Sequence, residues 1–306
     1  MNIDLFNKII KNMNDLNLNM ESLIITQNNI EFSHFFTDEK ATNIHSISKT
    51  ITSVAFGIAL SKGYFKDSIE TFVMPYFNDI TISNKDNIPY LKNMKIKHLL
   101  TLTAGYEAQI LNENHLATLD NNINLIEFSL NYPIKHEPGS FFFYTNAPIY
   151  LLSTIIEKEV GMKLSEFVRK ELIEKLDIKT FNWKECNLHH SMGCTGIEIL
   201  PHDLHKIAKL FLNKGGYNNI QIIPKDWLTE MSTLKTLTPN NYDISRALPK
   251  YGYGYNLWIC KNEIYYHDGS NGQYMIIAPE KNMVITTTAK ENNMKPITKC
   301  MEELFY

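Results

Sequence analysis

The stretch HSISKTITSVAFGIALSKG, residues 45–63, combines a serine and a lysine three positions apart with an apolar helix pattern. Ser46 and Lys49 fit the spacing S-x-x-K, and side chains three positions apart on a helix are neighbours. The helical spacing that follows is carried by Ile47, Ile51, Val54, Ala55, Ile58 and Ala59, and Gly63 ends it. The stretch therefore predicts a buried helix with Ser46 and Lys49 in its first turn.

This pair has the chemistry of an activated nucleophile. A serine hydroxyl attacks poorly unless a nearby base takes its proton, and a lysine is such a base once burial or positive charge lowers its pKa. The first helical turn also offers free backbone N–H groups that favour an oxyanion. A capping serine beside a surface lysine is the alternative interpretation. Ser232 and Lys235 repeat the spacing, but a loop sequence, 236–241, follows them.

A second motif, Y-x-N, is formed by Tyr144 and Asn146 ahead of the apolar run 147–156. A tyrosine near two cations can exchange a proton with a serine and a leaving group, and an asparagine amide can hold both a lysine and a substrate carbonyl. The same spacing occurs at Tyr76 and Tyr217, so a loop tyrosine packed before a helix is also a consistent interpretation.

A third motif, H-x-G, is formed by His267 and Gly269 at the end of an expected strand. The glycine lets the backbone approach a ligand, and the N–H of Ser270 is a candidate oxyanion donor beside that of Ser46. The alternative is an ordinary hairpin, because Asn271-Gly272 is a frequent turn sequence.

Together the three motifs resemble the serine β-lactamase and penicillin-binding-protein superfamily, in its class C-like, esterase-like branch. They occur in the family's order, and HLLTLTAG, residues 98–105, is similar to its HLLTHTSG segment. The resemblance covers nearly the whole chain. It implies an acyl-enzyme mechanism in which Ser46 attacks a carbonyl and Lys49 and Tyr144 shuttle its proton. The N–H groups of Ser46 and Ser270 would hold the oxyanion, Asn146 would orient the site, and no cofactor is implied.

The order of the expected elements predicts an α+β fold, with an antiparallel sheet flanked by helices and an inserted all-helical region. Strands are expected at 22–27 and 29–35, and again at 253–260, 263–267, 273–278 and 283–288. Helical spacing occupies 123–130, 147–159, 164–176 and 203–212, and helices are expected at both ends of the chain. We therefore predict a sheet domain from 1–65 and 246–306, and a mostly helical domain from 66–245.

Composition narrows the range of partners. The chain has 306 residues, 44% hydrophobic and 21% charged, with a net charge of −3, which excludes a disordered protein and disfavours nucleic-acid and membrane partners. We expect a small-molecule or peptide substrate, and the oligomeric state stays open. Four cysteines are too few for a disulfide scaffold, and charges interrupt the first 20 residues where a secretory signal would be apolar. A cytoplasmic protein with reduced thiols is the expectation.

The substrate is constrained by one departure from the family. Enzymes of the family that bind the carboxylate of β-lactams use a lysine where this chain has His267. The anionic side chain of Asp268, the next residue, is expected to repel a substrate carboxylate unless that side chain points away from the pocket. We expect weak or absent β-lactam hydrolysis and an ester, amide or small-peptide substrate. Loops 111–121 and 234–250 are candidates for substrate selection, whereas the aromatic residues at 141–143 and 150 are expected in the core.

Three alternatives remain. A D,D-carboxypeptidase of the penicillin-binding type would use the same residues, and a non-catalytic ligand-binding module could keep the fold. A zinc site is conceivable in a cluster of cysteine and histidine residues, although its spacing matches none of the usual patterns; these residues are Cys186, His189, His190, Cys194, His202 and His205. We expect no metal.

Overall fold

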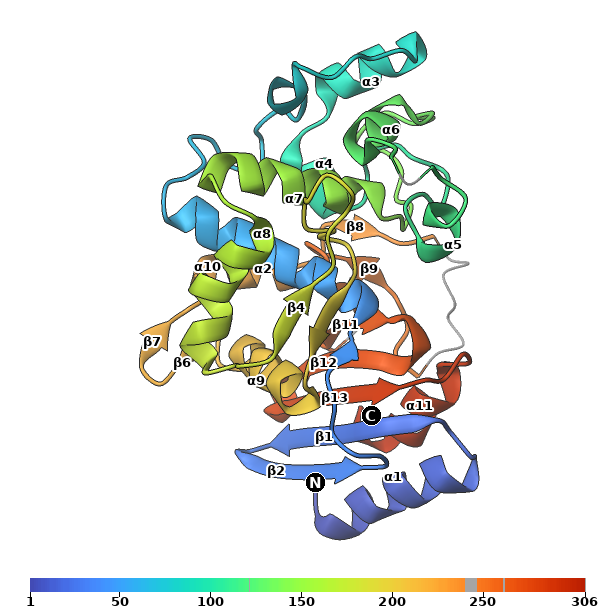
Figure 1. Ribbon diagram of the computed structural model, residues 1–306. Helices are drawn as coiled ribbons and strands as arrows, with labels where there is room; N and C mark the ends of the chain where they lie inside the picture. The colour runs from blue at the N-terminus through green and yellow to red at the C-terminus, as the bar shows by residue number, and fades with distance from the viewer. Residues whose placement is uncertain (121, 240–246, 261, 306) are drawn as a thin grey trace.

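One antiparallel sheet joins the two ends of the chain in the computed structural model, which describes residues 1–120, 122–239, 247–260 and 262–305 (Figure 1). Its eight strands run in the order β2-β1-β13-β12-β11-β10-β9-β8, so β1 pairs directly with β13. The strands are β1 (Met20–Gln27), β2 (Ile30–Phe35), β8 (Thr236–Leu237), β9 (Gly252–Tyr253), β10 (Trp258–Ile259), β11 (Tyr265–Gly269), β12 (Gln273–Ala278) and β13 (Met283–Ala289). The predicted α+β fold on an antiparallel sheet is confirmed.

The two faces of the sheet are covered by different helices, because successive strand residues point to opposite faces. On one face, Phe32 of β2 contacts Phe6 of α1 (Ile3–Asp15), with ring centroids 5.5 Å apart. On the other, Thr26 of β1 and Thr286 of β13 each lie 2.8 Å from a ring nitrogen of His205, in α9 (Pro201–Leu212). Both ends of the chain thus contribute strands to a sheet that is covered on both sides.

The remaining helices are α2 (Ser48–Ser61), α3 (Ile88–Asn93), α4 (Ile96–Leu100), α5 (Glu113–Leu116), α6 (Leu125–Asn131), α7 (Ala147–Val160), α8 (Leu164–Val168), α10 (Lys225–Ser232) and α11 (Lys295–Cys300). Most of them lie between β2 and β8 along the chain, and Figure 1 shows α3, α4, α6 and α7 in the upper part of the view, at the opposite end of the molecule from α1. Helix α11 follows β13 and contacts α1. Two small sheets also occur between β2 and β8, β3 (Thr42–Asn43) with β5 (Ile197–Ile199) and β4 (Phe181–Trp183), and the pair β6 (Gly216–Tyr217) and β7 (Ile220–Gln221). Among the described helices, none has the length and apolar character of a membrane span.

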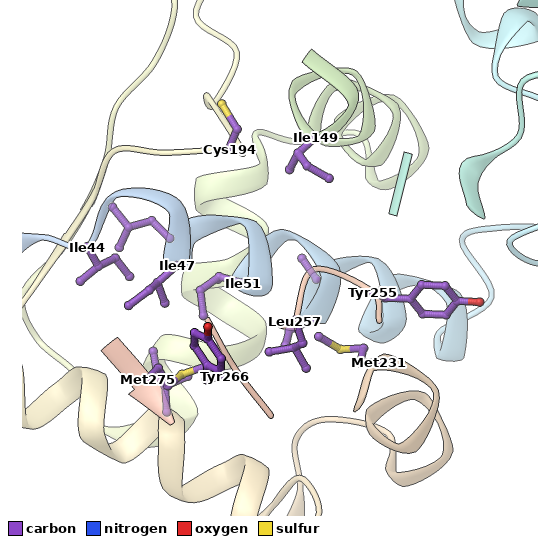
Figure 2. Close-up of a cluster of buried hydrophobic side chains, with 14 of the residues drawn as sticks. Ile44, Ile47, Ile51, Ile149, Cys194, Met231, Tyr255, Leu257, Tyr266 and Met275 are labelled. Atoms are coloured by element: carbon purple, nitrogen blue, oxygen red, sulfur yellow. The ribbon is translucent and has the colours of Figure 1, made fainter. Parts of the chain in front are cut away.

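Helix α2 is the central element of the core. Its residues from Ser48 to Ala59 are all buried, which is typical of a helix surrounded by protein on every side. Figure 2 shows Ile51 near Tyr266 and Met275 from the sheet, with Ile149 of α7 on the opposite side of the helix. The buried helix predicted from residues 45–63 is confirmed.

The sequence-based prediction differs from the structure in several elements, and it did not include the short helices α3, α4 and α5, helix α10 or strand β8. The predicted strand 253–260 is two short strands, β9 and β10, which pair with each other across a turn where Asn256 adopts φ 58°. The predicted helix 164–176 ends its α-helical part at Val168 and continues as π and 3-10 turns. The small strands β3 to β7 were not predicted, because they are too short to show an alternating pattern. The predicted domain boundary at 245/246 lies outside the described residues.

Gly57 of α2 is required where α10 packs against it, and this contact generates a stability prediction. A Cβ at Gly57 would lie 1.9 Å from Cδ1 of Trp227, whose indole N–H donates to the carbonyl of Ser53 at 2.9 Å. Gly57→Ala must displace the indole and its hydrogen bond, so we expect the free energy of unfolding in urea to fall by about 2 kcal/mol. In a Trp227→Leu background the same change should cost much less; an equal cost in both backgrounds would contradict this explanation.

Candidate active site

Ser46 lies on a 3-10 turn, His45–Ile47, directly before α2. Two hydrogen bonds hold the chain where it enters this turn: the N–H of Ile44 donates to Ile197 O at 2.9 Å, and the N–H of His45 donates to Asn43 Oδ1 at 2.8 Å. His45 has φ 47°, a left-handed conformation that is uncommon for a residue other than glycine. The surrounding contacts thus fix the backbone that presents the half-buried Ser46 side chain.

Strand β11 approaches the same turn closely enough to require a glycine. A Cβ at Gly269 would lie 2.3 Å from the carbonyl oxygen of Ile44, a distance that no side chain can accept. The absence of a side chain therefore lets the end of β11 lie against the residue that precedes His45. This approach packs β11, which carries His267 and Gly269, against the turn that carries Ser46, and Ser270 lines the same pocket as Ser46.

Lys49 is fully buried below Ser46. Its Nζ lies 2.9 Å from Ser46 Oγ, donates to the carbonyl of Cys194 at 3.1 Å, and lies 4.9 Å from the centre of the Tyr144 ring. Burial penalises the charged ammonium and lowers the pKa of Lys49 to about 8, although the neighbouring Cys194 and Asp268 oppose this shift. About one-tenth of the amine is then neutral at pH 7, within reach of the serine proton.

Tyr144 and His267 are hydrogen-bonded to each other beside this pair. The hydroxyl of Tyr144 lies 3.1 Å from His267 Nε2, and His267 Nδ1 lies 2.6 Å from Oγ1 of Thr50, the residue after Lys49. Burial, with the nearby cation of Lys49 adding to it, lowers the pKa of His267 to about 3. His267 is therefore a neutral imidazole at physiological pH, at the position where the carboxylate-binding enzymes named above use a lysine.

Asp268 points away from this group of side chains, as alternation along β11 allows. Its Oδ1 accepts from the indole N–H of Trp258 at 2.8 Å, and its Oδ2 lies 3.3 Å from Nζ of Lys250. Lys250 also lies over the Trp258 ring, 3.8 Å from its centre. The charge of Asp268 is thus compensated by Lys250, and the expectation that Asp268 repels a substrate carboxylate is corrected.

A pocket of about 310 Å³ opens above Ser46. Four of the predicted residues line it, Ser46, Tyr144, Asn146 and Ser270, together with Gln109 and Glu113 from the loop before α5 and its first turn. The amide of Asn146 donates to the carbonyl of Leu111 at 2.9 Å, whereas the sequence-based prediction placed it against Lys49. The pocket is consequently lined largely by polar side chains next to the nucleophile.

Several groups at the site were missed by the sequence-based prediction. Thr50, Gln109 and the carbonyl of Cys194 belong to no motif, and a backbone carbonyl leaves no trace in residue types. Part of loop 111–121 does reach the pocket through Glu113, whereas residue 121 and residues 240–246 of the second loop lie outside the described residues. Phe142 and Tyr150 are buried in the core as expected, and Phe141 and Phe143 are half-buried.

The cysteine and histidine cluster is dispersed over separate contacts. His190 bonds to Glu157 at 2.6 Å and His202 to Glu39 at 2.9 Å, while Cys186 Sγ lies 3.3 Å from the hydroxyl of Tyr150. Within the described ranges, no three His, Cys, Asp or Glu side chains are grouped so that they could hold a metal ion.

Known proteins are similar to this chain in sequence or in fold. Protein flp of Staphylococcus aureus (strain NCTC 8325 / PS 47) is 23% identical over 109 residues, which span 35% of this chain and only 22% of that protein. The octameric penicillin-binding protein homologue from Pyrococcus abyssi matches with a TM-score of 0.79 at 20% identity, over 100% of this chain and 77% of that chain. EstCE1, a hydrolase with promiscuous acyltransferase activity, matches with a TM-score of 0.75 at 13% identity, over 97% and 98% of the two chains.

At these identities the structural matches establish the fold alone, and the family follows from the sequence. The family model described as Beta-lactamase matches residues 34–297, which is most of the chain. That range contains all three motifs and every side chain described above around Ser46. The chain therefore belongs to the β-lactamase family.

Proposed function

We propose that this protein is a serine hydrolase that cleaves an ester, an amide or a small peptide through an acyl-enzyme on Ser46. The observation that carries the proposal is the 2.9 Å separation between Ser46 Oγ and Lys49 Nζ, together with the burial that lowers the pKa of Lys49 to about 8. A nucleophile and a partly neutral base within hydrogen-bond reach are the minimum that serine acylation needs.

The proposed first half-reaction forms the acyl-enzyme. Ser46 Oγ bonds to the substrate carbonyl carbon while its proton passes to the neutral amine of Lys49. The N–H groups of Ser46 and Ser270 stabilise the resulting oxyanion. The carbonyl re-forms as the bond to the leaving group breaks, and the leaving group takes a proton from the Lys49 ammonium, directly or across the hydroxyl of Tyr144.

The second half-reaction releases the acid. A water molecule attacks the acyl carbonyl and gives a proton to Lys49, which returns it to Ser46 Oγ as the ester bond breaks. The net reaction consumes one water and yields an acid and an alcohol or amine, so the side chains end in their starting protonation states. EstCE1, which has the same fold, is a hydrolase with promiscuous acyltransferase activity, and an acyl-enzyme fits that chemistry.

The substrate preference follows from His267. A neutral imidazole with a pKa near 3 offers no positive charge to a carboxylate, and Asp268 is held by Lys250 and Trp258 instead of facing the pocket. We therefore propose a substrate without a carboxylate at this point and weak or absent β-lactam hydrolysis. A D,D-carboxypeptidase would need to bind such a carboxylate, and for this reason it is the less favoured enzyme.

Covalent labelling tests the nucleophile. A fluorophosphonate should add one adduct mass to the wild-type protein and none to Ser46→Ala, because the phosphorus bonds to Ser46 Oγ. Ser270→Ala is the matched control: its proposed role uses the backbone N–H, so labelling should persist. Intact-mass spectrometry makes the measurement. Labelling that survives in Ser46→Ala, or a folded wild-type protein that no activated ester or fluorophosphonate labels, would favour a non-catalytic binding module.

The pH dependence of activity tests the base. Because the neutral amine of Lys49 takes the proton, kcat/KM for an activated ester should rise about tenfold per pH unit below pH 8 and level off above it. Lys49→Ala and Tyr144→Phe should each lower turnover at least about 100-fold. Lys62→Ala is the control at the exposed end of the same helix. A flat profile from pH 6 to 9, with turnover retained in Lys49→Ala, would contradict the assignment.

A matched pair of β-lactams tests the substrate preference. A chromogenic cephalosporin should be hydrolysed no faster as the free carboxylate than as its methyl ester, because neutral His267 provides no charge-assisted hydrogen bond. An enzyme that recognises the carboxylate should favour the acid by about 10- to 100-fold, the value of one such bond. Rapid hydrolysis of the free acid, measured by its absorbance change, would show that our account of His267 is wrong.

A further inference from the structure

We propose that Thr50 is a positioning residue: it holds His267 in the tautomer with the proton on Nδ1, and thereby directs the hydroxyl proton of Tyr144 toward His267 Nε2. The assignment of the tautomer rests on the hydrogen-bond geometry alone. The effect of the tautomer on turnover rests on the function proposed above, in which Tyr144 relays a proton.

The hydroxyl of Thr50 has two partners and a single proton. Thr50 is fully buried in α2, and its Oγ1 donates to the carbonyl of Asn256 at 2.9 Å and lies 2.6 Å from His267 Nδ1. A carbonyl oxygen can only accept, so the hydroxyl proton belongs to the bond with Asn256. The oxygen of Thr50 must then accept from the ring, which places the proton of neutral His267 on Nδ1.

Asn256 is anchored so that its carbonyl stays in this position. It is fully buried with φ 58°, its Nδ2 donates to Ser53 Oγ at 2.9 Å, and its N–H donates to the carbonyl of Leu100 at 3.2 Å. Tyr253 donates to its Oδ1 at 3.4 Å. If the Thr50 proton turned to the ring instead, a buried carbonyl would lose this donor, which is the costlier arrangement.

The bare Nε2 of His267 is then an acceptor for Tyr144. With Nδ1 protonated, the 3.1 Å contact between Nε2 and the Tyr144 hydroxyl has one consistent direction, in which the phenol donates. The low pKa of His267 keeps the proton on the phenol, so Tyr144 rests as a neutral donor whose oxygen can accept from the Lys49 ammonium. When the leaving group needs a proton, the Tyr144 hydroxyl turns from His267 to the leaving group and donates its proton, while its oxygen accepts the proton of Lys49. Tyr144 is thereby regenerated and its hydroxyl returns to His267.

Nuclear magnetic resonance of ¹⁵N-histidine protein tests the tautomer without any substrate. Long-range ¹H–¹⁵N correlations distinguish the protonated from the bare nitrogen of each neutral ring, and the His267 signals are those missing from His267→Gln. We expect a proton on Nδ1 in the wild type and in Thr50→Ser, which keeps the hydroxyl. In Thr50→Val, and in Thr50→Ala as a second variant, a new population with the proton on Nε2 is expected.

Kinetics with an activated ester test the consequence. Thr50→Val should lower kcat about 10- to 100-fold with little change in KM, and Thr50→Ser should restore most of the loss, because the hydroxyl positions Tyr144 through His267 and does not touch substrate. Thr154→Val is the matched control, a buried threonine whose hydroxyl donates to Leu151 O within α7. It should leave both the His267 spectrum and kcat unchanged.

A wild-type ring protonated on Nε2 overturns the proposal, as does an unchanged tautomer in Thr50→Val, whatever its rate. A changed tautomer with unchanged kcat overturns the effect on turnover. If neither Thr50→Val nor Thr50→Ala folds, the spectra of the wild type and of Thr50→Ser decide the tautomer. Because the spectrum needs no turnover, a protein that fails the Ser46 labelling test still yields a result on Thr50, so the two failures are distinguishable.

Discussion

The burial of a lysine amine beside a serine is the constraint on which the rest of the structure depends. An ammonium ion in a dry interior loses its hydration, and it persists there only with hydrogen-bond acceptors close by. The chain provides Ser46 Oγ, the carbonyl of Cys194 and the face of the Tyr144 ring around Lys49 Nζ. These three neighbours come from separate parts of the chain, so the lysine environment exists only in the assembled fold.

The central position of α2 is a consequence of that constraint. A helix that buries Lys49, Thr50 and Ser53 needs a partner for each polar group as well as apolar contacts on all sides. The sheet supplies His267 and Asn256 on one side, and α7 supplies apolar contacts on the other (Figure 2). The polar groups buried along α2 therefore fix its position against the sheet, which generic hydrophobic packing would leave less defined.

Residue patterns predicted the helices and strands in which apolar or β-branched residues recur with a regular spacing. The apolar spacing of residues 45–63 predicted α2, and β-branched runs at the two ends predicted strands that pair as β1 and β13. The reversal at Asn256 was missed because the aromatic run around it is as suitable for one strand as for two. Alternation alone could not establish which way Asp268 points, since its partners Lys250 and Trp258 lie on other segments.

At the candidate site, too, sequence patterns predicted some groups and missed others. Ser46, Tyr144, Asn146 and Ser270 have side chains or neighbours that form motifs, and all four line one pocket. Thr50 and the carbonyls of Asn256 and Cys194 act through hydrogen bonds between segments far apart in sequence, and backbone carbonyls are the same in every residue. A sequence motif therefore identifies the reacting groups more readily than the groups that orient them.

The separation of Thr50 and His267 by 217 positions has a consequence for synthesis on the ribosome. A growing chain makes the serine and the lysine well before the strand that carries the histidine and packs beneath α2. Until that strand emerges, the side of α2 that packs on the sheet is uncovered. The nascent chain then exposes apolar residues of the helix, and the site is incomplete. The site therefore cannot assemble before β11 has been synthesised, and shielding of the helix falls to the ribosome and to chaperones in the interval.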